Sequence, residues 1–101
     1  MGSSQQTVQE AITDLPPAEV LARAKSFFAS RPSLYSAFLD MEGPGFCSFR
    51  GQGGEEVIVA AANAPEGGTR VTGSTYLFDM QLARFLTTLP PVAQRDRKSV
   101  V

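Results

Sequence analysis

Residues 49–59, FRGQGGEEVIV, contain a glycine-rich loop between two apolar runs. In a phosphate-binding loop such glycines precede a helix, whose first backbone N–H groups bind the anion. Here the β-branched residues that follow Gly54 predict a strand instead, and the carboxylates of Glu55 and Glu56 would repel an anion. The stretch therefore predicts a β-hairpin in which glycines supply positive φ angles.

Further strands are predicted on both sides of this hairpin, because apolar and polar residues alternate there. The segments predicted as strands are 7–15, 34–42, 46–50, 55–62 and 69–77. The last four are separated by short turns, Gly43-Pro44-Gly45 among them. Such short connections favour an antiparallel meander.

Two segments have helical spacing of their apolar residues instead. The first begins near Pro17, where Asp14 is placed to cap it, and the second covers residues 78–89, with Asp79 near its start. The apolar stripes comprise Val20, Leu21, Ala24, Phe27 and Phe28 in the first segment, and Phe78, Leu82, Phe85, Leu86 and Leu89 in the second. Each stripe needs an apolar surface, and one face of the sheet can cover both.

The sequence thus predicts an α+β fold, a five-stranded antiparallel sheet with two helices packed on one face, in the order β-α-β-β-β-β-α. One domain is expected over residues 7–90, with a disordered N-terminus over 1–6 and a flexible C-terminal tail over 91–101.

The composition argues against catalysis and against a resident cofactor. The 101 residues contain no histidine and one cysteine, so neither histidine-activated nucleophiles nor histidine-ligated metals are available. Cys47 lies in an apolar alternating stretch and is expected to be a small buried hydrophobe. We therefore expect a non-enzymatic protein with no catalytic, cofactor or metal residues.

The charged residues near the hairpins are expected to be solvated. Glu55 and Glu56 can form cross-strand ion pairs with Arg50 or Arg70. Asp40 and Glu42 are predicted to share a face of their strand, which would allow a carboxylate pair or a weak metal site. Beside a Gly-Pro-Gly turn they are expected instead to be simply exposed.

Charge and hydropathy also limit the class of partner and the compartment. A net charge of −1 disfavours nucleic-acid binding, which depends on Lys and Arg. No apolar run approaches the roughly 20 residues of a membrane span. No secretory signal is visible, and a single cysteine suits a reducing compartment, so a cytoplasmic location is expected.

The element order over residues 7 to about 90 resembles one repeat of the TATA-binding-protein-like fold. It is also similar to the helix-grip fold of START and pollen-allergen-type lipid binders. The resemblance is one of topology alone, so no functional residue is carried over from either family. It implies a curved sheet with one of two uses. A saddle of two repeats, made here by dimerisation, would hold nucleic acid, whereas a helix-grip domain would enclose an apolar ligand against its C-terminal helix.

Apolar residues occur on both faces of the predicted strands, although a sheet covered on one side should alternate cleanly. A small domain would then expose an apolar patch, and such patches mark interaction surfaces. The helix-free face is therefore expected to be covered by a second copy in a homodimer, or alternatively by an apolar small molecule. The candidate residues are Tyr35, Phe38, Phe46, Phe49 and Ile58.

Overall fold

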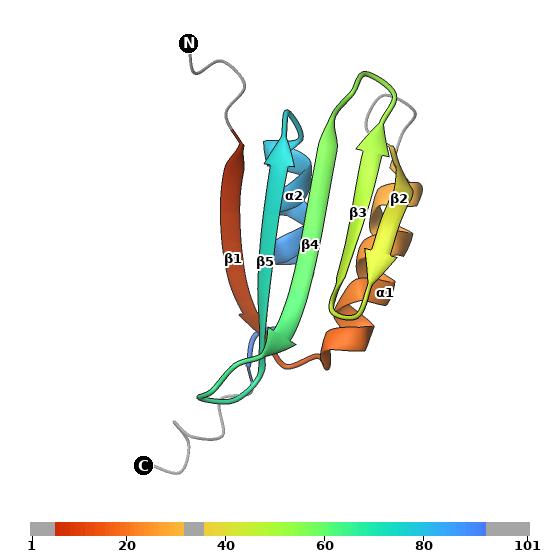
Figure 1. Cartoon of the computed structure of the whole chain (residues 1–101). Coiled ribbons are helices and arrows are strands. Elements are labelled where there is room, and N and C mark those ends of the chain that lie inside the picture. Colours follow the sequence, from red (N-terminus) through yellow and green to blue (C-terminus); the bar gives the residue numbers. More distant parts are fainter. Residues whose placement is uncertain (1–5, 32–35, 93–101) are drawn as a thin grey trace.

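The computed structural model describes residues 6–31 and 36–92, which form one antiparallel sheet and two helices (Figure 1). The elements are β1 (Thr7–Thr13), α1 (Pro17–Ala29), β2 (Ala37–Gly43), β3 (Phe46–Gly51), β4 (Glu56–Asn63), β5 (Thr69–Tyr76) and α2 (Asp79–Thr87). The strand order is β1-β5-β4-β3-β2, and every neighbouring pair is antiparallel. The predicted fold class and element order are confirmed, whereas most of the two terminal segments predicted to be disordered or flexible lies outside the described residues.

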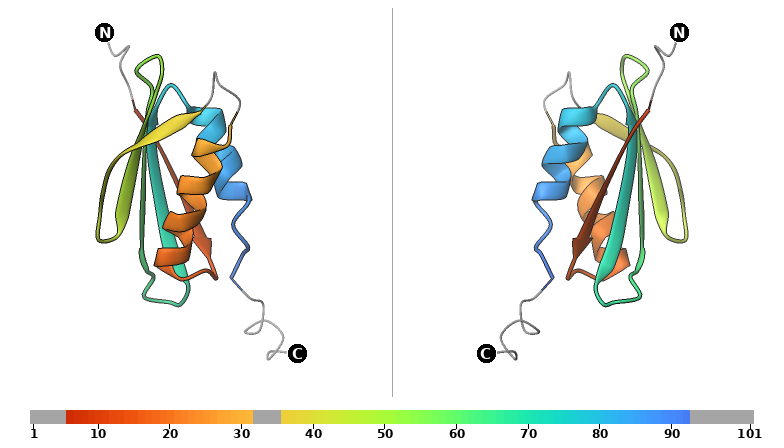
Figure 2. Two further views of the ribbon diagram at one scale, coloured as in Figure 1. Left: turned by 90° about the vertical axis from the view of Figure 1, so that its right-hand side faces the viewer. Right: turned by 90° about the vertical axis from the view of Figure 1, so that its left-hand side faces the viewer.

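Both helices lie against the same face of the sheet, as the side views in Figure 2 show. Helix α1 packs against β2, β3, β4 and β5, and α2 packs against β1 and β5. Between the layers, the ring of Phe28 lies 5.2 Å from that of Phe49 on β3 and 5.7 Å from that of Phe85 on α2. These tilted contacts are the geometry that aromatic pairs prefer, and they join both helices to the sheet through one core.

Gly73, in the middle of β5, lies where α2 packs closely against the sheet. A Cβ atom at this position would lie 2.5 Å from Cδ1 of Leu82, which is fully buried. A glycine inside a strand lacks a side chain to pack and often marks such a close approach. The missing side chain therefore sets the distance between α2 and β5.

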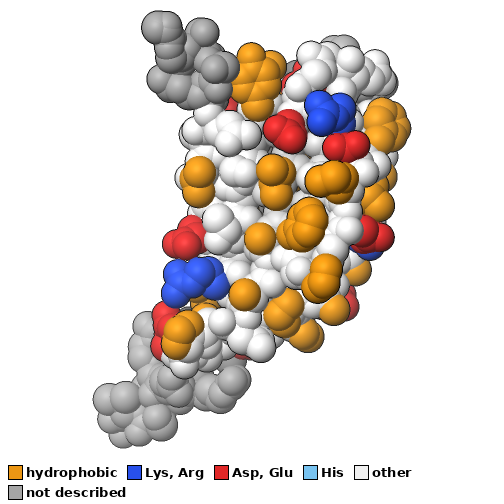
Figure 3. All heavy atoms as spheres, in the orientation of Figure 1, with side chains coloured by type: hydrophobic (Ala, Val, Ile, Leu, Met, Phe, Trp, Pro, Cys, Tyr) orange, Lys and Arg blue, Asp and Glu red, His pale blue; other side chains and the backbone are white. Residues whose placement is uncertain are grey.

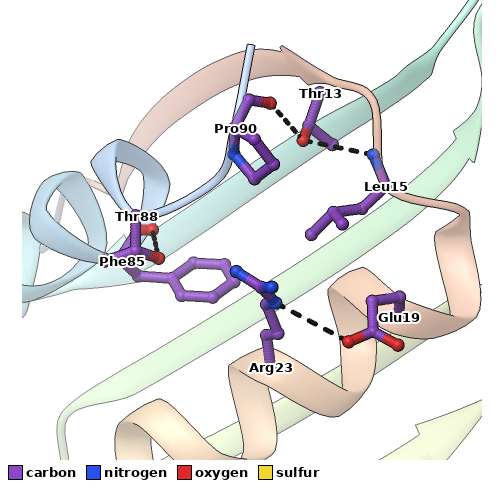
Figure 4. A network of polar contacts seen from close by, with 7 residues as sticks. All are labelled: Thr13, Leu15, Glu19, Arg23, Phe85, Thr88 and Pro90. Carbon is purple, nitrogen blue, oxygen red and sulfur yellow. Dashed lines mark hydrogen bonds and ion pairs between the residues drawn. The ribbon is translucent and has the colours of Figure 1, made fainter. Parts of the chain in front are cut away.

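The end of β1 is held by the segment that follows α2 (Figure 4). The hydroxyl of Thr13 donates to the carbonyl oxygen of Pro90 at 2.6 Å and accepts from the amide of Leu15 at 3.4 Å. The amide of Asp14 also donates to Pro90, at 3.3 Å. Helix α1 begins at Pro17, near the predicted start, but Asp14 is not its N-cap as predicted. The N-cap is Pro16, which makes no side-chain cap hydrogen bond.

The glycine-rich loop between β3 and β4 is the predicted hairpin turn. The amide of Gly51 donates to the carbonyl oxygen of Glu55 at 2.8 Å, and Gly54 has a φ of +93°. The carboxylate of Glu55 accepts from the amide of Gly53 at 2.9 Å, so this acid stabilises the turn itself. Strand β4 follows directly, so the glycines lead into a strand and not into a helix.

Candidate functional site: the helix-free sheet face

The sheet surface opposite the helices, here called the helix-free face, carries alternate residues of all five strands and faces the viewer in Figure 3. The strand register places these residues on it: Val8, Glu10 and Ile12 of β1; Phe38 and Met41 of β2; Phe46, Ser48 and Arg50 of β3; Glu56, Ile58, Ala60 and Ala62 of β4; and Arg70, Thr72, Ser74 and Tyr76 of β5.

Apolar side chains form a band across this face over β2, β3 and β4 (Figure 3). Phe38 is 57% exposed and Met41 is 58% exposed, while Phe46 and Ile58 beside them are half-buried. We call Phe38, Met41, Phe46 and Ile58 the apolar band. A face that only met water would carry polar residues at these positions.

Three of the five predicted site residues, Phe38, Phe46 and Ile58, lie on the helix-free face. Phe49 does not: it is 1% exposed and packs against Phe28 in the core. Three positions separate it from Phe46, and an odd separation places two strand residues on opposite faces. Tyr35 lies outside the described residues.

Met41 belongs to the apolar band because of a β-bulge in β2. The register shifts between Leu39, which pairs with Phe49 on the core side, and Met41, which pairs with Ser48 on the helix-free side. One extra residue, Asp40, is inserted there, and it reverses the alternation of all residues beyond it. Sequence periodicity could not reveal this insertion, so Met41 was missed as a site residue.

The same bulge separates two acids that a regular strand would place together. Asp40 forms an ion pair with Arg50 on the helix-free side, at 3.5 Å. Glu42 instead pairs with Lys25 of α1, on the helix-covered side, at 2.6 Å. The prediction that Asp40 and Glu42 share a face was wrong for this reason.

Two groups of charges flank the apolar band at opposite corners of the face (Figure 3). At one corner Arg50 pairs with Asp40 and lies across from Glu56. At the other, Arg70 contacts Glu10 at 3.5 Å and Glu66 at 3.6 Å. The predicted ion pairs of Glu55 and Glu56 with these arginines were therefore wrong: Arg50 pairs with Asp40, and Arg70 pairs with Glu10 and Glu66. The carboxylate of Glu55 binds its own turn, and Glu56 lies across from Arg50 without an ion pair between them.

These charges also affect how the two edges of the sheet can associate. Glu10 is the central residue of β1, and Asp40 is the central residue of β2. If either edge paired with its own copy about a two-fold axis, like charges would face each other, which is destabilising. Charged residues on edge strands are a common protection against edge-to-edge pairing. These charges therefore disfavour contact between copies through either edge of the sheet.

A shallow hollow of about 270 Å³ lies beside the apolar band. Small residues make up most of its lining, which also includes Arg70 and Thr72. Its lining residues are Pro44, Gly45, Ala60, Ala61, Ala62, Arg70 and Thr72. The helix-free face therefore has both protruding side chains and a recess that can receive one.

The thiol of Cys47 lies away from the helix-free face. Cys47 is fully buried on the helix-covered side, as expected, and burial raises the pKa of its thiol to about 11. Within residues 6–31 and 36–92, no cluster of three or more His, Cys, Asp or Glu is placed to hold a metal ion. In that same part of the chain, neither helix is long and apolar enough to cross a membrane.

Comparisons of the chain with protein-family models, curated proteins and solved structures find no match. The functional interpretation consequently depends on the geometry of the helix-free face.

Proposed function

We propose that this protein is a non-catalytic module that self-associates through the helix-free face of its sheet. The observation that carries the proposal is the apolar band, in which Phe38 and Met41 are each more than half exposed. Fully burying a side chain of this size contributes roughly 1.5–3 kcal/mol relative to leaving it in water. Covering the band with a second copy would therefore favour association.

The size of the face fits a small reversible dimer. Five strands spaced about 4.8 Å apart, each roughly 20 Å long, cover on the order of 500 Å² in projection. Typical stable interfaces bury about 800 Å² of accessible surface on each partner. The projected area of this face is smaller than that value, so the contact would be a small one, and we expect a dimer whose population depends on protein concentration.

We propose that the relief of the face allows two copies to fit together. An isologous dimer uses the same patch on both copies, so each contact between two different features occurs twice. The protruding side chains of β2, such as Phe38, can enter the hollow above Ala60 and Ala62 of the partner. The charge groups at Arg50 and at Arg70 each contain positive and negative side chains. Either group can therefore face a second copy without placing only like charges opposite each other.

Light scattering coupled to size exclusion, over a range of concentrations, tests this proposal. The wild-type mass should rise from that of the 10.8 kDa monomer towards twice this value. Phe38→Glu should remain monomeric, because it places a charge in the band. Met80→Glu is the matched control, since Met80 on α2 is 68% exposed and lies away from this face. A wild type that stays monomeric at high micromolar concentration would refute self-association.

An apolar-ligand binder of the helix-grip type is the alternative, and the geometry favours it less. A ligand between the sheet and the helices would have to displace the contacting rings of Phe28, Phe49 and Phe85. Helix α2 has nine residues, which is short for a helix that must enclose a ligand. Native mass spectrometry of the purified protein distinguishes the two, because a co-purified apolar ligand would support the alternative.

Nucleic-acid binding by a saddle-like dimer has less support. The helix-free face and its margin carry two arginines, Arg50 and Arg70, and each lies beside carboxylates. Phosphate contacts need uncompensated Lys and Arg. Salt-sensitive binding to duplex DNA would be the result that supports this function instead.

A further inference from the structure

Two of the three methionines lie in the described part of the chain, and both expose their side chains. Met41 is 58% exposed in the apolar band, and Met80 is 68% exposed on α2. Oxidation of methionine adds an oxygen atom to its thioether and turns an apolar side chain into a polar one. Both side chains are open to an oxidant in solution, but only Met41 belongs to the surface proposed to bind a second copy.

Met41 stands among the other side chains of the apolar band. Its backbone pairs with Ser48, which pairs with Ile58, so these three residues form one row across the sheet. Phe38 and Phe46 lie in the rows on either side of it, on the same face. Ser48 is 4% exposed although it lies on the helix-free face, because the larger side chains around it cover it. A second copy that covers the band therefore buries the Met41 thioether as well.

Burial of a sulfoxide in this contact is unfavourable. A sulfoxide oxygen accepts hydrogen bonds from water, and the side chains of Phe38, Phe46 and Ile58 have no donor to replace that water. Burying a polar group without a hydrogen-bond partner costs free energy. In an isologous dimer the same residue of both copies lies in the contact, so the cost is incurred twice. Oxidised copies should therefore dimerise at least about tenfold more weakly.

We propose that Met41 is an oxidation site that controls association through the helix-free face, with a peroxide as the oxidant. One peroxide oxygen is transferred to the thioether sulfur. The O–O bond breaks as the S–O bond forms, the sulfur loses the two electrons that the peroxide gains, and hydrogen peroxide leaves as water. Methionine sulfoxide reductases reverse the change. The inference rests on the self-association proposed above and adds a means of regulating it.

Cys47 is the other described side chain with a sulfur atom, and the fold protects it from the same oxidant. It is fully buried on the helix-covered side, and burial raises the pKa of its thiol to about 11. Little of the reactive thiolate therefore exists at neutral pH. Met80 is open to oxidation but lies on α2, away from the helix-free face. Among these residues, Met41 alone joins exposure to oxidant with a place in the apolar band.

Treatment of the purified wild type with hydrogen peroxide, followed by sedimentation equilibrium, tests the inference. Peptide mass spectrometry first establishes that Met41 carries one added oxygen. The Kd of the dimer should then rise at least about tenfold, and the two methionine sulfoxide reductases, one for each epimer, should restore it. Met41→Leu should keep its Kd after the same treatment, because leucine is apolar and has no sulfur. Met80→Leu is the matched control and should lose association as the wild type does.

The rate of oxidation at different protein concentrations gives a second measurement. As the concentration rises into the range of the dimer, Met41 should be oxidised more slowly relative to Met80, because the contact shields Met41 alone. The inference alone is overturned if the wild type dimerises equally well with Met41 oxidised, if Met41→Leu is as sensitive as the wild type, or if the relative rate stays constant. An untreated wild type that stays monomeric at high micromolar concentration refutes the proposed self-association, and the inference falls with it.

Discussion

Gly73→Ala should destabilise the fold although alanine is intrinsically better than glycine in a strand. The added Cβ would lie 2.5 Å from Cδ1 of Leu82 and 3.0 Å from its Cδ2. Leu82 is fully buried, so its side chain has little room to move aside. Overpacking of this kind costs about 1–3 kcal/mol, and the relief of glycine's backbone entropy returns roughly 0.5–1 kcal/mol. The expected loss in the free energy of unfolding is therefore about 0.5–2 kcal/mol.

Urea denaturation followed by circular dichroism measures this loss, with all variants at one protein concentration because association shifts apparent stability. Ser74→Ala is the matched control, since the adjacent residue points to the helix-free face. Leu82→Ala alone should cost about 2–5 kcal/mol by leaving a cavity. In the double variant the methyl at position 73 should fill part of that cavity, so the two costs should not add. Additive costs, or a stabilising Gly73→Ala, would refute the close approach of α2 to β5.

Two further predictions concern buried polar groups. Because the pKa of Cys47 is raised from 9.0 to about 11, the folded protein keeps a proton that the unfolded chain loses. The contribution of this thiol to the free energy of unfolding should be complete below about pH 9. It should fall by about 2–3 kcal/mol as the pH approaches 11. The free energy of unfolding of Cys47→Ala should lack this fall between about pH 9 and 11. If it falls with pH as steeply as that of the wild type, the raised pKa of Cys47 is contradicted. Thr13→Val should cost about 1–3 kcal/mol, because the carbonyl of Pro90 loses its hydroxyl partner. Hydrogen exchange at the Asp14 amide, which also donates to Pro90, should be faster in Thr13→Val than in the wild type. An unchanged exchange rate would show that the Thr13–Pro90 hydrogen bond does not hold this segment.

The element order could be predicted because each pattern reflects a local period. Val20, Ala24 and Phe28 recur at helical spacing, and all three are buried on α1 as this spacing requires. In β4, Val57 and Val59 alternate with Ile58, and the structure places them on opposite sides of the sheet. Such periodicities follow from backbone geometry alone, so they are readable without knowledge of the tertiary packing.

The residues of the candidate site were less predictable because they depend on pairing between strands. That Phe46 and Phe49 face opposite sides follows from their spacing, but which of them meets the helices depends on packing. The bulge at Asp40 arises from the match of β2 to β3, and it is what brings Met41 onto the helix-free face.

The most direct test of the central claim is an isotope-filtered NOE experiment on equal amounts of labelled and unlabelled protein. At concentrations where the mass is that of a dimer, intermolecular NOEs should connect the side chains of the helix-free face, such as Met41, Phe38 and Ile58, with their counterparts in the other copy. Intermolecular NOEs that involve only the exposed surface of α2, such as Met80, would contradict the proposal. A protein that stays monomeric and shows no intermolecular NOEs at millimolar concentration would contradict it as well.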